Sequence, residues 1–143
     1  MIIDKDLILF DLTGDKETII STLANQAFEQ GRLEDKQKYI EAVLKREKEY
    51  STALGYEVAI PHGSEKEIIN PKIVIATLKK PILWNQHEVQ IVFLIAMNML
   101  EPQVTKNTLK DLYAIMDNKQ AMQVLSNAKD AKEIIHYLKG CNG

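Results

Sequence analysis

The architecture of this chain follows from one apolar run, Val89-Gln90-Ile91-Val92-Phe93-Leu94-Ile95-Ala96-Met97. A run with so few polar residues is typical of a strand that is buried on both faces of a sheet. The shorter run from Ile73 to Leu78, apolar apart from Thr77, predicts a second strand, and Val58 to Ile60 predicts a third. We therefore expect a sheet at the centre of the molecule, with these strands as its core.

Helical patterns stand on both sides of these strands in the sequence. Asp15 is a suitable cap for a helix over Lys16 to Gln30, which Gly31 ends, and a second helix is expected from about Asp35 to Glu49. The other expected elements are a short leader with a strand within Ile2 to Leu12, a loop over Ser51 to Glu57, and helices over about Lys106 to Met116, Lys119 to Asn127 and Asp130 to Lys139, the last ended by Gly140. Helices before and after the strands indicate an α/β layer structure. We expect residues 1–143 to form a single domain.

The composition limits the partners and the location that this chain can have. Its 143 residues carry a net charge of −2, with no basic stripe, so nucleic acid is not an expected partner. Cys141 is the only cysteine, which excludes a disulfide within the chain and fits the reducing cytoplasm. Acidic residues near the N-terminus argue against an export signal, and the run from Val89 to Leu100 is shorter than the about 20 residues of a membrane helix. We expect a cytoplasmic protein without membrane insertion.

The strongest candidate for chemistry is His62, in the run Ala59-Ile60-Pro61-His62-Gly63. The proline stops the strand, and the glycine leaves space beside the imidazole. A nucleophilic ring at the exit of a strand holds the usual position of a working group in an α/β domain. A histidine that merely ends a strand before a turn is the alternative, and these five residues alone do not decide between the two.

The residues before His62 favour phosphoryl chemistry. An imidazole nitrogen can accept a phosphoryl group, and the guanidinium of Arg46, near the end of the second helix, suits the charge on its oxygens. The hydroxyls of Ser51 or Thr52 could donate further hydrogen bonds, and Gly63 would let a backbone N–H approach. Each has an ordinary reading, a solvated helix end for Arg46 and turn chemistry for Ser51 and Thr52. Their combination favours the functional reading.

The segment from Leu44 to Gly63 resembles the signature of the enzyme IIA domains of the fructose/mannitol class. These domains belong to the bacterial phosphoenolpyruvate-dependent sugar phosphotransferase system. The block Lys79-Lys80-Pro81-Ile82 with Trp84, the strand from Val89 to Ala96, and the helical tail from Leu109 to Leu138 are also similar, so the resemblance covers the whole chain. It implies a mixed central sheet flanked by helices on both faces.

The resemblance also implies a function. His62 would accept a phosphoryl group from the phosphorylated carrier protein HPr and pass it to a IIB component of a sugar permease, supported by Arg46. Many members of the family carry a second histidine at the start of the helix after the long strand. This chain has Thr105 there, which could donate a hydrogen bond to the phosphoryl group but cannot share a proton in the same way.

Two other functions remain open. IIA-like domains also occur in bacterial transcription activators and antiterminators, where phosphorylation reports sugar supply, and the block from Lys79 to Trp84 with the missing histidine resembles that subgroup equally. A plain α/β binding domain without phosphoryl chemistry is the third reading.

The remaining candidates have weaker support. His87 is expected in an exposed loop, His136 half-buried on the last helix, and Trp84 packed against or at the rim of the sheet, with a carbohydrate platform as the less favoured role. The spacing of the histidines gives no metal site, and no nucleotide or other cofactor motif occurs. For HPr docking we expect an apolar patch beside His62, bordered by acids such as Glu57, Glu65 or Glu67.

Overall fold

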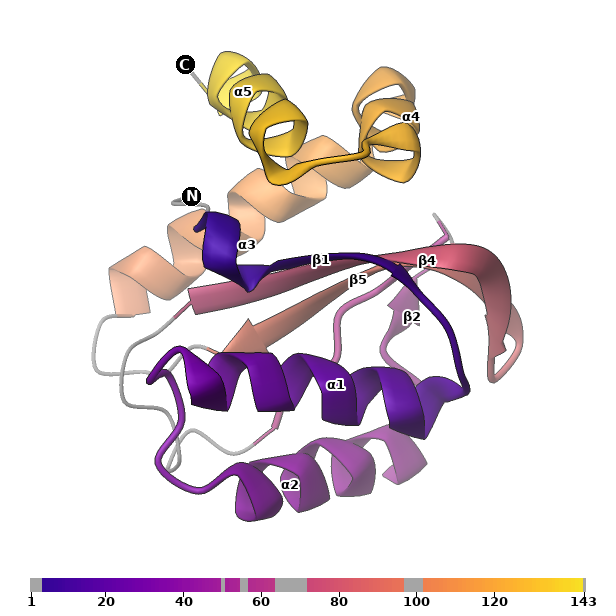
Figure 1. Ribbon diagram of the computed structural model, residues 1–143, viewed down its shortest axis with the longest axis vertical. Helices are drawn as coiled ribbons and strands as arrows, with labels where there is room; N and C mark the ends of the chain where they lie inside the picture. The colour runs from indigo at the N-terminus through magenta and orange to yellow at the C-terminus, as the bar shows by residue number, and fades with distance from the viewer. Residues whose placement is uncertain (1–3, 50, 55–56, 64–71, 97–101, 143) are drawn as a thin grey trace.

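A computed structural model describes residues 4–49, 51–54, 57–63, 72–96 and 102–142 of the chain. One sheet lies between two helical layers (Figure 1). The first layer is α1 (Lys16–Glu29) with α2 (Lys36–Glu49), and the second is α3 (Pro102–Met116), α4 (Lys119–Asn127) and α5 (Ala131–Asn142). This arrangement confirms the expected α/β class with helices on both faces.

The sheet has the strand order β1-β4-β5-β3-β2 and mixes parallel and antiparallel pairs. Its strands are β1 (Ile8–Leu12), β2 (Ala53–Leu54), β3 (Val58–Ala59), β4 (Lys72–Trp84) and β5 (His87–Ala96). β4 and β5 form an antiparallel pair at the centre, while β1 runs parallel to β4 and β3 runs parallel to β5. Antiparallel β2 completes the edge beside β3. The implied mixed sheet is thus confirmed.

β5 holds the two layers together because its side chains alternate between the two faces of the sheet. Val92, Leu94 and Ala96 belong to the apolar cluster that contains α1 and α2. Ile91, Phe93 and Ile95 belong to the second cluster, beneath the C-terminal helices. Each of these six residues is at most 9% exposed, which confirms that this strand is buried on both faces.

The predicted beginning of α1 is confirmed at atomic detail. The Asp15 carboxylate accepts a hydrogen bond of 2.8 Å from the Thr18 backbone N–H, the arrangement of an N-cap. This bond lowers the pKa of the Asp15 carboxyl below its ordinary value. At the other end Gly31 has a φ of +71°, a conformation that costs glycine little, so the chain turns there into α2.

Several predicted boundaries were wrong. The segment expected as a loop over Ser51 to Glu57 contains the strand β2, which is too short to show the alternation of apolar and polar residues. β4 continues past Leu78 to Trp84, across an irregularity in its pairing with β5 that accommodates Pro81. α3 begins at Pro102 rather than Lys106, because proline is well placed in the first turn of a helix. α5 continues past Gly140 to Asn142. None of the helices within the described ranges combines the length and apolar character that a membrane span requires.

Candidate functional site

His62 lies on the segment that continues β3 alongside β5. Val58 and Ala59 pair in parallel with Ile91 and Val92, and His62 keeps the same register as the bridge partner of Ile95. The Ile95 backbone N–H donates to the Pro61 carbonyl at 2.9 Å, so the proline interrupts the strand without detaching it from the sheet. The histidine is therefore fixed where β3 and β5 both end, the edge at which α/β sheets usually bind ligands.

The imidazole of His62 has a defined orientation. Its Nδ1 lies 3.1 Å from the backbone carbonyl oxygen of Ile60. A carbonyl can only accept a hydrogen bond, so this contact requires the proton to be on Nδ1. The neutral ring then carries its lone pair on Nε2. Because the side chain is partly exposed, this nitrogen is the atom of His62 that is suited to act as a nucleophile.

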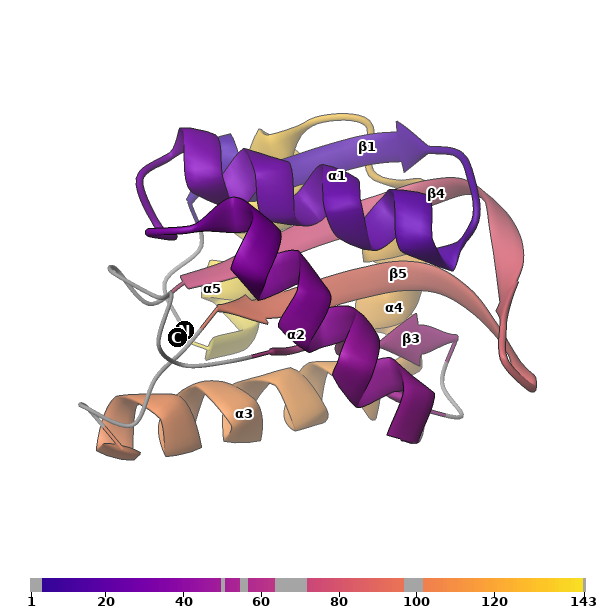
Figure 2. The same ribbon diagram turned by 90° about the horizontal axis from the view of Figure 1, so that it is seen from below.

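Gly63 allows α2 to approach the histidine segment closely. A Cβ atom at residue 63 would lie 2.8 Å from the Cγ2 of Val43 and 3.0 Å from its backbone nitrogen. Real side chains do not tolerate such distances without displacement of a neighbour. Glycine at this position is therefore required by the packing of α2 against the segment, and Figure 2 shows α2 crossing this side of the sheet.

Tyr39 connects α2 with the end of β5 and with the histidine segment. Its hydroxyl donates a hydrogen bond of 2.8 Å to the Ile95 carbonyl and accepts one from the Gly63 backbone N–H. Burial raises the pKa of this hydroxyl well above its ordinary value, and the bond from Gly63 opposes that shift to a smaller extent. The Tyr39 hydroxyl thus bridges the end of β5 and the histidine segment, with one hydrogen bond to each.

Arg46 lies in the last turn of α2, as the sequence predicted. It follows Val43 by about one turn and shares the helix face that packs on Gly63. Side chains on a helix lean toward its N-terminus, so Arg46 is directed back toward the level of Val43. Its side chain is partly buried. Arg46 thus belongs to the helix that packs against Gly63, the residue next to His62 in the chain.

The two predicted hydroxyls have different surroundings. The Ser51 hydroxyl accepts a hydrogen bond of 3.1 Å from the Ala53 backbone N–H, which is turn chemistry. Thr52 is buried, at 4% exposed, and its hydroxyl and its backbone N–H both donate to the Glu47 carboxylate. None of the described contacts joins either hydroxyl directly to the imidazole. Both residues belong to the segment that leads from α2 into β2.

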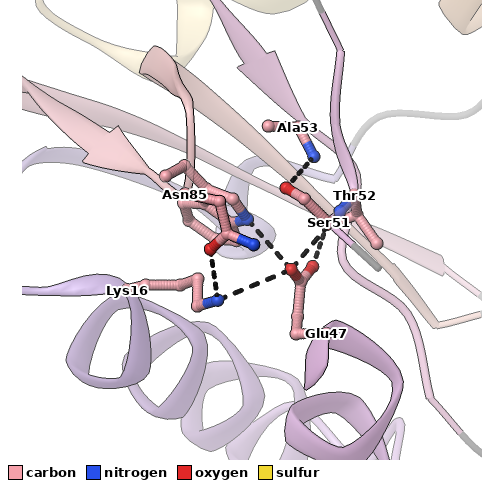
Figure 3. Close-up of polar contacts among 7 residues, drawn as sticks. Lys16, Glu47, Ser51, Thr52, Ala53 and Asn85 are labelled. Carbon is pink, nitrogen blue, oxygen red and sulfur yellow. Dashed lines mark hydrogen bonds and ion pairs between the residues drawn. The ribbon is translucent and has the colours of Figure 1, made fainter. Parts of the chain in front are cut away.

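Sequence reasoning missed Glu47, a buried acidic residue with several described polar partners. It is 3% exposed, and its carboxylate accepts hydrogen bonds from Thr52 and from the Trp84 indole N–H, the latter at 3.2 Å. Lys16 lies 3.8 Å away and donates to the Asn85 side chain (Figure 3). Because Glu47 stands within a run of charged residues, it resembled a solvated residue. Its spacing of four from Val43 and eight from Tyr39, both buried, was the signal that could have found it.

The remaining candidates lie elsewhere or only partly within the described residues. Thr105 is in the first turn of α3, and only its backbone is described. His87 is exposed, as predicted, but it is the first residue of β5 and not a loop residue, and His136 is exposed and not half-buried. Trp84 is fully buried, so it packs in the core and offers no carbohydrate platform. Glu57 is exposed, while Glu65 and Glu67 lie outside the described residues. In the ranges that the structure covers, no three potential ligands gather into a metal site.

Residues 1–141 match the sequence family described as phosphoenolpyruvate-dependent sugar phosphotransferase system, EIIA 2. The fold and this match define the class of the chain as a phosphotransferase component. The chain belongs to the EIIA 2 family of that system.

Relatives of two kinds are similar to this chain. The transcriptional regulator ManR of Bacillus subtilis (strain 168) is 32% identical over 120 residues, which are 84% of this chain and 18% of the regulator. The mannitol-specific EIICBA component of Buchnera aphidicola is 28% identical over 141 residues, 96% of this chain and 22% of that protein. The chain therefore spans about a fifth of the length of these curated relatives.

Solved structures share the fold. The crystal structure of IIA mannitol from Escherichia coli has a TM-score of 0.83 at 20% identity, with 96% of this chain and 99% of that chain covered. The E. coli enzyme IIAMTL in its complex with phosphorylated enzyme IIBMTL also has a TM-score of 0.83, at 21% identity, with 96% and 97% covered. These likenesses confirm the expected mannitol-type architecture.

Proposed function

We propose that this chain accepts a phosphoryl group on Nε2 of His62 from phosphorylated HPr and passes it to a IIB component for sugar uptake. The orientation of the His62 ring carries the proposal. The Ile60 carbonyl holds the proton on Nδ1, which leaves the lone pair on Nε2 at the end of two parallel strands. Membership of the EIIA 2 family supports the direction of transfer.

The proposed step needs no external base. The Nε2 lone pair of His62 attacks phosphorus, and the N–P bond forms as the bond from phosphorus to its carrier on HPr breaks. The Nδ1 proton stays on its hydrogen bond to the Ile60 carbonyl, which stabilises the positive charge that develops on the ring. In the second step a nucleophile of IIB attacks the same phosphorus, and the N–P bond to His62 breaks as the new bond forms. Both steps exchange one bond to phosphorus for another.

We assign the supporting roles by position. Arg46 stabilises the charge on the phosphoryl oxygens because a guanidinium stays protonated and binds two oxygens at once. Thr105, in the first turn of α3, takes the place of the family's second histidine and donates a hydrogen bond. Ser51 is a supporting donor of lower rank. Thr52 supports the site indirectly, with its hydroxyl bound to the Glu47 carboxylate.

The proposed partners follow from the relatives. One relative is the multiphosphoryl transfer protein 1 of E. coli, 32% identical over 128 residues, which are 88% of this chain and 15% of that protein. Another has been seen with phosphorylated enzyme IIBMTL. We propose that residues 1–143 act as one cytoplasmic domain that docks HPr and IIB in turn, with exposed Glu57 at the border of the surface.

The test is phosphorylation by phosphoenolpyruvate, enzyme I and HPr, followed by the intact mass of the protein. Wild type should gain one acid-labile phosphoryl group, His62→Ala should gain none, and the exposed control His136→Ala should gain it at the wild-type rate. Arg46→Gln should slow uptake by about 100-fold, because a charged donor to the transferring group is lost. Labelling of His62→Ala, or no labelling of wild type, would refute the proposal.

A regulatory role is the second candidate, and specific relatives favour it. ManR is one, and the probable licABCH operon regulator of B. subtilis, 30% identical over 132 residues, is another. In this role phosphorylation of His62 would report sugar supply. The full reading frame separates the two functions: a DNA- or RNA-binding module in the same protein indicates regulation, and IIB and IIC modules nearby indicate transport.

A further inference from the structure

We infer that Glu47 is a positioning residue for His62. Glu47 acts on the imidazole through the backbone of Thr52 and Ile60. This inference rests on the proposed function only for its kinetic consequence. Its structural part concerns the orientation of the imidazole and can be measured without any phosphorylation.

The Glu47 carboxylate joins three segments that are distant in the sequence. It belongs to the last turn of α2, it accepts the two donors of Thr52 before β2, and it accepts the Trp84 indole at the end of β4. Its Oε2 atom lies 3.3 Å from the Thr52 nitrogen and 3.2 Å from the Trp84 Nε1. Figure 3 shows these contacts converging on one carboxylate.

Hydrogen-bond donors and a cation surround the buried Glu47 carboxylate. A buried carboxylate without partners is strongly unfavourable, and bonds from N–H and O–H groups together with a cation reduce that cost. Lys16 supplies the cation at 3.8 Å, and its own amino group is held at 2.9 Å from the Asn85 side-chain oxygen. The arrangement orders the carboxylate, and with it the turn of α2 that also carries Arg46.

A continuous series of hydrogen bonds leads from this carboxylate to the imidazole. Thr52 is held by Glu47 at its hydroxyl and its N–H, and its carbonyl accepts the Ile60 N–H at 3.1 Å. The Ile60 carbonyl in turn lies 3.1 Å from Nδ1 of His62. Within Thr52 and within Ile60, the N–H and the carbonyl belong to adjacent peptides that share one Cα, so each bond restrains the position of the next peptide through the backbone. Glu47 therefore helps to position the residue whose carbonyl selects the tautomer of His62.

Two short strands make this support necessary. β2 pairs only with β3, over two residues, so backbone pairing alone orders the Thr52 segment weakly, while the Ile60 segment is also held by the pairing of β3 with β5. Without the Glu47 acceptors, the Thr52 N–H would be left buried and unpaired, and its segment would rearrange to satisfy it. The Ile60 carbonyl would then lose its alignment with Nδ1, and the ring proton could move to Nε2, the attacking atom.

The experiment compares three variants of the full chain. Glu47→Gln keeps the shape, and the rotating Thr52 hydroxyl can accept from the new amide, so phosphoryl uptake should stay within about threefold of wild type. Glu47→Met keeps the length but removes both acceptors, and should lower the maximal rate at saturating phosphorylated HPr by about tenfold or more, with little change in KM. Trp84→Phe is the matched control, because it removes a donor to Glu47 but no bond in the series to His62.

The decisive readout is the tautomer of His62, measured from nitrogen-detected imidazole spectra of each variant across a series of pH values. Wild type, Glu47→Gln and Trp84→Phe should show the proton on Nδ1, and Glu47→Met should show a substantial share on Nε2. If Glu47→Met fails to fold, Thr52→Val replaces it, with Trp84→Phe still as the control. The proton on Nε2 and the slower phosphoryl uptake are then expected only in Thr52→Val.

The inference is overturned if Glu47→Met, or Thr52→Val in its place, keeps the wild-type tautomer and rate. It is also overturned if Trp84→Phe lowers the rate and moves the ring proton to Nε2 as much as Glu47→Met does. Glu47 would then act only through general stability. Failure of the proposed function has a different signature. In that case wild type takes up no phosphoryl group, while the tautomers still differ among the variants.

Discussion

The centre and the β3–β2 edge of the sheet are held together by different means. β4 and β5 pair from Lys72–Ala96 to Trp84–His87, and their buried side chains fill both apolar clusters. β3 and β2 pair over two residues each, β3 also pairs with β5, and buried polar side chains of α2 supply further connections. The stability of the fold therefore resides mainly in the centre, and the precision of the site resides in one helix and its hydrogen bonds.

This difference predicts that substitutions at the centre and at the site affect stability and activity to different extents. Loss of apolar volume at the centre should lower the stability of the whole molecule but leave each folded molecule active. Small changes where α2 meets the histidine segment should cost less stability and more activity. Three substitutions, taken from the largest expected loss of stability to the smallest, test this division.

Phe93→Ala should have the largest effect on stability. Phe93 is fully buried on β5, and its truncation should lower the free energy of unfolding by about 3–5 kcal/mol. Urea unfolding measures this loss, and phosphoryl uptake per folded molecule should remain near wild type. Leu83→Ala, at a residue that is 69% exposed, is the control, with a change below about 0.5 kcal/mol. A cost for Phe93→Ala below that of Gly63→Ala would contradict the comparison.

Gly63→Ala should have a smaller effect on stability and a large effect on transfer. The new Cβ would lie 3.0 Å from the Val43 backbone nitrogen, so α2 or the histidine segment must move, at a cost of about 1–3 kcal/mol. The displacement should lower the rate of phosphoryl uptake about 100-fold. Gly31→Ala is the matched control, because its φ of +71° also disfavours alanine but no atom lies within 4 Å. Equal rates for the two variants would rule out the close approach as a requirement.

Tyr39→Phe should have the smallest effect on stability at neutral pH. It removes the hydroxyl between the Ile95 carbonyl and the Gly63 N–H, at a cost of about 1 kcal/mol. Chemical denaturation measures the change, and Tyr113→Phe, at a residue that is 50% exposed on α3, should be neutral. A neutral Tyr39→Phe would show that the backbone pairing alone holds the segment.

The same variant makes a prediction for alkaline pH. The pKa of the Tyr39 hydroxyl is raised by burial, so the unfolded chain releases its proton at a lower pH than the native protein does. Its contribution to stability is complete below the ordinary pKa of 10.0 and decreases as the pH rises above it. The wild-type free energy of unfolding should therefore fall more steeply above pH 10.0 than that of Tyr39→Phe. Parallel curves would contradict the burial of this hydroxyl.

Periodicity and capping were sufficient to predict most of the fold. The apolar run of β5, the Asp15 cap of α1 and the bounds of α4 were all predicted, because each has a strong local signal. β2 was not predicted because two residues carry no period. The continuation of β4 was missed because Lys79, Lys80 and Pro81 break its apolar pattern while its backbone still continues to Trp84.

The site was predicted in part for a similar reason. His62 and Arg46 stand in a motif that can be recognised in the sequence; the structure places His62 beside the end of β5 and Arg46 in the last turn of α2. The partners of Thr52 could not be predicted, because its contact with Glu47 depends on how α2 packs on the sheet. Glu47 itself lies in a run of charges whose burial becomes visible only when the helix has a defined face.

Trp84, the only tryptophan of the chain, gives the protein a built-in optical probe. Its indole is fully buried and donates to the Glu47 carboxylate, so fluorescence excited selectively at tryptophan observes that one location. A shielded indole emits at shorter wavelength than one in water, and its emission is sensitive to a nearby charge. Mixing experiments with partner proteins could therefore follow, in real time and without an attached dye, changes that reach the Glu47 carboxylate.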